Sequence, residues 1–149
     1  TEGEKIVFKG IPSFSPEIFK TVVNLEPFKT KQLLKGIDQL CEEGVSQVFK
    51  KYDNRQIIGA VGALQFEVIR YRLEHEYGAT CRFDSLEFFK ACWLKCSDQK
   101  ILDKFIQVRK EQIAKDKDGN DVYLAETRWS LDREIRENPD IEFHFTSEY

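Results

Sequence analysis

The stretch 59-GAVGALQFEVIRYRLEHEYG-78 places two glycines three positions apart, directly before a run with helical periodicity. The apolar side chains of this run recur every three or four positions, at Phe66, Ile69, Leu73 and Tyr77. Such spacing indicates a helix with one buried face, and Gly78 is placed to end it. The fold then depends on the elements that precede and follow this helix.

An earlier helix is indicated over residues 28–44. Its apolar residues fall on one face, at Leu33, Ile37, Leu40 and Cys41. Gly44 is placed to cap its C-terminus. Residues 45–62 then hold two short apolar runs around three turn formers, Asp53, Asn54 and Arg55. This pattern predicts a β-hairpin between the two helices.

Residues 15–27 fit either a helix or a strand. We predict a strand, because Pro16 and Pro27 bracket too few residues for a stable helix. Residues 79–86 return to a strand pattern after the second helix. The order is therefore β-α-β-β-α-β, which predicts a ferredoxin-like sandwich over residues 14–84, with two helices on one face of an antiparallel sheet.

Five further elements are indicated beyond residue 85. They are an aromatic-rich strand (86–96), a helix (97–116), a strand (122–129), a short helix (130–138) and a strand (140–145). The first helix has a predicted buried stripe of Leu102, Phe105, Arg109 and Ile113, and the turn 116–121 follows it. We predict a second small β-α-β-α-β unit over residues 85–149, with antiparallel or mixed sheets and no repeat of the first half. The fold class is α+β.

The composition excludes several classes of protein. The 149 residues suffice for one domain or two small ones. Residues 1–84 are neutral overall and residues 85–149 carry the net charge of -3, so any nucleic-acid contact must be a local patch. No apolar run reaches the ~18 residues of a membrane span. The four cysteines lack the spacing of a disulfide scaffold, which predicts a cytoplasmic chain with reduced thiols. We also expect the chain to be monomeric. The absence of methionine suggests a piece of a longer protein.

The motifs point away from catalysis. Gly59 and Gly62 fit the G-x-x-G loop that clamps RNA, or the close packing of a strand end against the second helix. No G-x-x-x-x-G-K-[ST] phosphate loop occurs, and the turn 116–121 lacks the flanking ligands of an EF-hand. Cys92 and Cys96 lie too far apart along a strand to share a zinc ion. We predict no catalytic, cofactor-binding or metal-binding residues.

Basic side chains gather around the first helix and the hairpin. The candidates are Lys29, Lys31, Lys35, Lys50, Lys51 and Arg55. Such residues form either a solvated face or a small patch that contacts phosphates, since each cation that neutralises a phosphate adds salt-dependent affinity. We treat them as candidate contacts to RNA.

Two long segments carry a family resemblance. TKQLLKGIDQLCEEGVSQVF (30–49) and IIGAVGALQFEVIRYRLEHEYGATCRF (57–83) closely resemble the C-terminal region of the bacterial peptide chain release factor 3 family, GTPases that recycle the stop-codon-reading release factors. FKGIPSFSPEIF (8–19) resembles the passage out of that family's barrel domain. A looser likeness extends to the third domain of elongation factor G.

The resemblance implies a mechanical function. Residues 1–13 would be the end of a preceding barrel domain or a linker, while GTP and magnesium would bind to an N-terminal domain of the parent protein. This chain would then be a non-catalytic arm of the factor that removes decoding release factors after peptide release. Its implied partners are the ribosome, through rRNA and a small-subunit protein, and the parent's own GTPase and barrel domains, with no membrane.

Two readings from other classes remain open. The lysines also fit a free-standing ferredoxin-like RNA-binding module, which would bind RNA with a steep salt dependence. A small enzyme that uses Cys92 or Cys96 as a nucleophile is the third reading.

Overall fold

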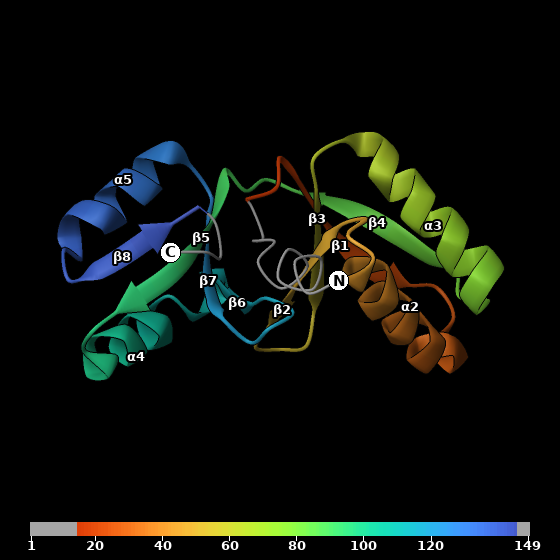
Figure 1. Cartoon of the computed structure of the whole chain (residues 1–149), viewed down its shortest axis with the longest axis horizontal. Coiled ribbons are helices and arrows are strands. Elements are labelled where there is room, and N and C mark those ends of the chain that lie inside the picture. The colour runs from red at the N-terminus through yellow and green to blue at the C-terminus, as the bar shows by residue number, and fades with distance from the viewer. Residues whose placement is uncertain (1–14, 146–149) are drawn as a thin grey trace, which may run out of the picture.

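Residues 15–145 are described by the structure, a computed structural model (Figure 1). The segment 1–13, expected as the end of a preceding barrel domain or a linker, lies outside this range. The described strands are β1 (Ile18–Asn24), β2 (Gln47–Lys51), β3 (Gln56–Ala60), β4 (Cys81–Leu86), β5 (Lys90–Cys96), β6 (Ile113–Lys115), β7 (Asp121–Ala125) and β8 (Ile141–His144). The helices are α2 (Thr30–Glu42), α3 (Ala63–Tyr77), α4 (Gln99–Val108) and α5 (Arg128–Glu137), with 3-10 turns η1 (Pro27–Lys29) and η2 (Lys110–Gln112).

All eight described strands belong to one antiparallel sheet, in the order β4-β1-β3-β2-β6-β7-β5-β8. The α+β class is confirmed. The two halves share this one sheet, because β2 pairs with β6 and so joins them. Helices α2 and α3 cover one half of this sheet, and α4 and α5 cover the other (Figure 1).

The first half follows the sequence closely. Residues 15–27 contain strand β1, and both predicted helices are present, with Gly44 and Gly78 just beyond their ends at φ angles of +82° and +63°. Their predicted apolar faces are buried between the helices and the sheet. The buried members are Leu33, Ile37, Leu40, Cys41, Phe66, Ile69 and Leu73, with Tyr77 packed against them.

The second half differs from its prediction in one element. The helix expected over 97–116 ends at Val108, and Ile113 lies in strand β6, where it is paired with Tyr123 of β7. Ile113 is buried in either arrangement, so apolar spacing alone did not distinguish them. Trp129 lies in the first turn of α5 instead of ending β7. The predicted β-α-β-α-β unit is therefore β-α-β-β-α-β.

This correction reveals a repeat that the sequence did not show. Both halves have the element order β-α-β-β-α-β, and the order β6-β7-β5-β8 is the reverse of β4-β1-β3-β2. The two halves meet through equivalent strands, β2 and β6, which are antiparallel. An approximate twofold axis therefore passes between these two strands.

A third apolar cluster lies on the face of the sheet opposite the helices. It contains Phe19, Phe49, Ile57, Ala91, Trp93, Ala114, Val122 and Leu124. The rings of Phe49 in β2 and Trp93 in β5 are 6.1 Å apart, although β6 and β7 lie between these strands. Three steps of ~4.8 Å across a flat sheet would separate them by about 14 Å. The sheet is therefore strongly curved, and both halves contribute to this cluster.

Candidate nucleic-acid interface

A groove of about 850 Å³ lies over the junction of the two halves. Strand β6 and the end of β2 contribute to its lining, α4 forms one wall, and the turns of the two hairpins complete it. In Figure 1, β2 and β6 lie between α4 and α2. The groove is rich in lysine from separate segments, at Lys50, Lys51, Lys110, Lys115 and Lys117.

Two of these lysines lie opposite each other in the sheet. The register of β2 and β6 pairs Lys50 with Lys115. Like charges directly opposite on neighbouring strands are unfavourable. Carboxylates offset this in part, because Lys50 Nζ lies 3.7 Å from Asp38 Oδ1 and Lys115 Nζ lies 2.7 Å from Asp121 Oδ1. An anion bound between the two lysines would relieve their repulsion further.

The other lysines leave positive charge available. Lys51 and Lys117 form no ion pair with any residue in the described range 15–145. Lys110 Nζ lies 4.6 Å from the centre of the Tyr52 ring, and the Tyr52 hydroxyl donates a hydrogen bond of 2.8 Å to Glu111. Tyr52 is 51% exposed, so an aromatic ring stands beside the lysines. Lysines next to an exposed ring suit contacts to phosphates and to an unpaired base.

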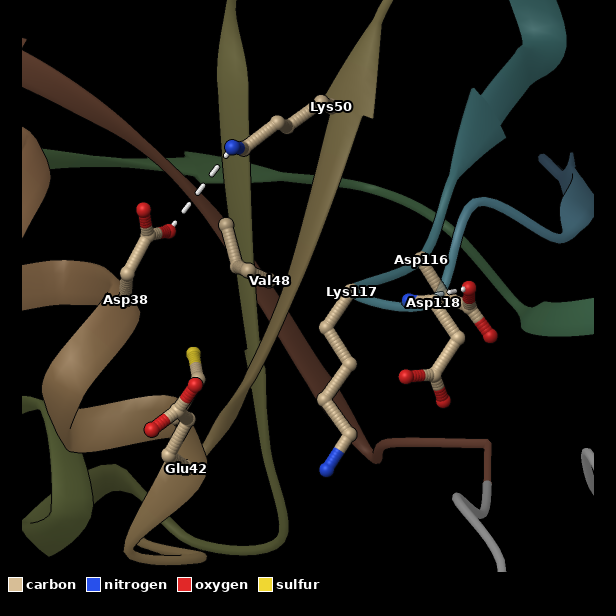
Figure 2. Close-up of a pocket in the computed structure, with 8 residues that line it drawn as sticks. Asp38, Glu42, Val48, Lys50, Asp116, Lys117 and Asp118 are labelled. Atoms are coloured by element: carbon tan, nitrogen blue, oxygen red, sulfur yellow. Dashed lines mark hydrogen bonds and ion pairs between the residues drawn. The ribbon is translucent and has the colours of Figure 1, made fainter.

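A second cavity, of about 520 Å³, adjoins this groove and shares Lys50, Asp116 and Lys117 with it (Figure 2). Carboxylates of α2 and of the hairpin turn also line it, so its charge is mixed. Asp38, Glu42 and Asp118 provide them. No group of three His, Cys, Asp or Glu side chains that could hold a metal ion occurs within residues 15–145.

Asp116 fixes the hairpin that carries Lys115 and Lys117. Its Oδ1 accepts hydrogen bonds of 2.9 Å from the backbone N–H groups of Asp118 and Asn120. Its Oδ2 accepts 2.8 Å and 3.1 Å bonds from Trp93 Nε1 and the Asn120 side chain. The turn 116–121 therefore joins strands β6 and β7, whereas the sequence analysis placed it between a helix and a strand. The buried carboxylate at its centre is occupied by protein donors.

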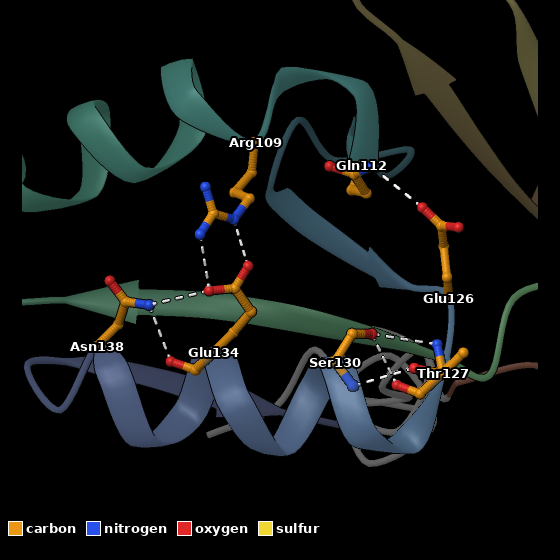
Figure 3. Close-up of polar contacts among 7 residues, drawn as sticks. All are labelled: Arg109, Gln112, Glu126, Thr127, Ser130, Glu134 and Asn138. Carbon is orange, nitrogen blue, oxygen red and sulfur yellow. Dashed lines mark hydrogen bonds and ion pairs between the residues drawn. The ribbon is translucent and has the colours of Figure 1, made fainter.

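A buried ion pair holds the α4 wall of the groove in place (Figure 3). Arg109 follows α4 directly and precedes Lys110, and its guanidinium forms a two-point ion pair with Glu134 of α5. Glu134 is 1% exposed and also accepts a 3.4 Å hydrogen bond from the Asn138 side chain. The hydrogen bonds to Glu134 raise the pKa of Arg109 further. Arg109 was predicted as part of an apolar stripe, and its function there is electrostatic.

The six residues predicted as contacts do not form one cluster. Lys50 and Lys51 lie in the groove. Lys31 and Lys35 are exposed on α2, at helical spacing from Asp38, which reaches Lys50. Lys29 lies near Gly78 at the far end of α3, and Arg55 is ion-paired with Asp53 at 2.7 Å. Their contact with RNA stays a prediction.

Sequence reasoning missed Lys110, Lys115 and Lys117. The helix predicted over 97–116 placed the first two on a helix surface, far from the hairpin of the first half. Their proximity to Lys50 depends on strand β6 and its pairing with β2. The Gly119–Asn120 turn could have indicated a hairpin with short strands on both sides, but not the strand to which β6 would pair.

The glycine motif does not offer a phosphate loop. The backbone N–H groups of Val61 and Gly62 both donate to the Gln65 side chain, at 2.8 Å and 2.9 Å. These are the groups that would face a phosphate at a helix N-terminus. We expected Gly59 to allow close packing of the strand end against the second helix. The structure gives a different reason for a glycine at this position, because a Cβ there would lie 2.3 Å from a carbon of Pro16.

The cysteines are poor nucleophiles. Burial raises the pKa of the Cys92 thiol to about 12 and the pKa values of Cys41 and Cys81 to about 11. The thiolate is the reactive form, so these groups are largely unreactive at neutral pH. Cys96 is half-buried. The raised pKa of Cys92 speaks against the reading that uses it as a catalytic nucleophile.

Thiol modification tests this description. At pH 8, Ellman's reagent should modify Cys96 quickly and the three other cysteines only after unfolding in urea. The raised pKa values of the buried thiols also stabilise the folded chain below pH ~8.5. This stabilisation is lost as the pH rises toward 11, because the thiols of the unfolded chain ionise first. Fast modification of all four thiols in the native chain would contradict the burial.

The comparison with protein families identifies the class. Residues 8–134 match the family described as "Class II release factor RF3, C-terminal domain". The class is therefore that of factors for translation termination. Because the match covers most of its 149 residues, the chain belongs to the RF3 C-terminal domain family, as the resemblance indicated. Within residues 15–145, no helix is long and apolar enough to cross a membrane.

Proposed function

We propose that the chain is the non-catalytic C-terminal region of a GTP-dependent release factor, which removes decoding release factors from the ribosome after peptide release. It acts in the cytoplasm as an arm that contacts the ribosome and orients the domains of the parent protein. GTP and magnesium bind to another domain of that parent. Membership of the RF3 family supports this proposal.

The lysine groove is the observation that carries the ribosome contact. Five lysines from both halves line it, while the chain as a whole has a net charge of -3. A local concentration of cations on an acidic protein suits a specific polyanion such as rRNA. The exposed lysines of α2, Lys31 and Lys35, extend this surface. A small-subunit protein beside the RNA is the second part of the proposed contact.

The architecture suits a rigid arm. We propose a ferredoxin-like subdomain over residues 14–84 and a second subdomain over 85–149, supported by the separate clusters under each helix pair. The continuous sheet and the shared third cluster couple the two units mechanically. A change in the orientation of one end would then be transmitted to the other without internal rearrangement.

A free-standing RNA-binding module is the alternative function. The groove itself favours it, because lysines beside an exposed tyrosine suit RNA without any reference to the family. This alternative predicts tight, salt-dependent binding of the 149-residue chain to RNA oligonucleotides. The release factor reading predicts binding to ribosomes and only weak binding to unstructured RNA.

Neutralising two groove lysines tests the contact. Lys51→Gln combined with Lys117→Gln should weaken ribosome binding and lower the slope of log K against log[salt] by about two, one per lost phosphate contact. Both side chains lack ion pairs within the described residues, so folding should be little affected. Binding of the 149-residue chain to purified ribosomes, measured across a salt series, provides the readout.

The matched control changes the same number of charges outside the groove. Lys100→Gln with Lys104→Gln, both exposed on α4 and not part of the groove lining, should leave the salt slope unchanged. An equal loss in both double variants would show a general charge effect. That result would contradict a ribosome contact through the groove.

A further inference from the structure

Helix α3 has a second apolar face that no described element covers. Its inner face packs on α2, β3 and β4. Its outer face, including the residue before its N-cap, carries large apolar side chains exposed to solvent, and α3 lies at the outside of the molecule (Figure 1). These are Val61 (73% exposed), Leu64 (75%), Val68 (40%) and Tyr71 (63%), which we call the outer stripe. A contiguous exposed apolar stripe indicates an interaction surface.

The spacing of the outer stripe specifies the shape of its partner. Steps of three, four and three residues join the four positions, and a further step of four reaches His75, whose ring lies 4.1 Å from that of Tyr71. This alternation is the seam of a helix that packs along another helix, with knobs from one fitting into holes of the other.

The flanks of the outer stripe specify the charge of that partner. Glu67 and Glu74 lie along one side, one heptad apart. On the other side, Arg72 is held by Glu43 and Glu76 at 2.7 Å each, so its charge is already neutralised. Arg70 pairs with Glu67 at 2.7 Å, and Glu74 forms no ion pair with any residue in the range 15–145. The edges of the stripe are acidic overall and would attract cations.

We propose that the outer stripe binds an amphipathic helix of a partner protein, with an apolar seam and Lys or Arg residues facing Glu67 and Glu74. Binding of an apolar helix face is an established way in which helices recognise partners. This contact goes beyond the RNA groove and does not depend on it, because the stripe includes none of the groove residues. It would give the chain a protein partner in addition to RNA.

A designed peptide tests the proposal on the 149-residue chain. The probe is a three-heptad helix with Leu at its seam and Lys at the flanking positions, compared with the same peptide carrying Glu at the flanks. The Lys peptide should bind, as measured by fluorescence anisotropy, and the Glu peptide should bind more weakly. Leu64→Gln with Val68→Gln should weaken the Lys peptide by about tenfold or more, as expected for central apolar contacts.

Control variants distinguish peptide binding at the outer stripe from nonspecific hydrophobic binding. Val108→Gln replaces an apolar residue of α4 that is 62% exposed, and it should leave binding unchanged. Glu67→Gln with Glu74→Gln should reduce the difference between the Lys and Glu peptides. Absence of Lys-peptide binding, or binding unaffected by the Leu64 and Val68 changes, would overturn the proposal. The proposal would also be overturned if sedimentation showed concentration-dependent dimers that Leu64→Gln abolishes, because a second copy of the chain would then cover the outer stripe.

Discussion

Replacing Trp93 by alanine should lower the free energy of unfolding by about 3 to 5 kcal/mol, the usual loss for a large buried aromatic side chain. Trp93 is fully buried at the centre of the cluster to which both halves contribute. Its loss would leave a cavity between the curved halves of the sheet. It would also remove the indole N–H that donates to the buried carboxylate of Asp116. Urea unfolding followed by circular dichroism measures the change.

Two further variants separate packing from hydrogen bonding at this position. Trp93→Phe keeps an aromatic ring but loses the N–H, and should cost about 1.5 to 3 kcal/mol, the worth of a hydrogen bond to a charged group. Trp129→Ala is the matched control, because Trp129 is 68% exposed on α5 and its loss should change stability by less than about 0.5 kcal/mol. Equal losses of unfolding free energy in Trp93→Ala and Trp129→Ala would contradict the central position of Trp93 in the cluster.

Replacing Glu134 by glutamine should cost about 3 kcal/mol, the low end of the range for breaking a buried ion pair, because Arg109 keeps partial access to water. Glutamine retains the size of the side chain but leaves the guanidinium without its counter-charge. The end of α4 would then be less firmly held against α5. Thermal and urea unfolding should both report the loss.

The repeat suggests the variant that completes this test. Glu134 lies seven residues after the N-cap of α5, and Ile69 occupies the same position in α3, where it is buried against apolar neighbours. Arg109→Met with Glu134→Ile should therefore recover most of the loss, since apolar replacements of a complete buried pair are often neutral or stabilising. Glu67→Gln, which breaks the exposed pair with Arg70, is the control and should cost less than about 1 kcal/mol. If the double variant were as unstable as Glu134→Gln, an unpaired buried charge would not explain the loss of stability in Glu134→Gln.

The first half was predictable because its local signals agree with one another. The apolar periods of α2 and α3, the glycines that end them and the turn at Asn54 each indicate the same element order. The second half was less predictable where one signal fitted two structures. Ile113 continues the helical stripe of Leu102 and Phe105, and it also fits a strand, so the end of α4 was placed too late.

The candidate site was predictable only in part. Lys50 and Lys51 are the last two residues of strand β2 and lie beside turn formers, which marks them as exposed at a hairpin. The other groove lysines lie about sixty residues further along the chain. Their place in the groove depends on the edge pairing of β2 with β6, and the sequence contains no local signal for that choice of partner.

The amino-acid sequence by itself determined the helices and most strands of this chain and the family to which it belongs, because each depends on short-range spacing or direct similarity. Tertiary structure decided the single curved sheet, the repeated topology, the ion pair of Arg109 with Glu134 and the groove where lysines of both halves meet. These features join residues that are distant along the chain. They follow from strand pairing and curvature, which are set by the packing of the whole domain and not by any one segment.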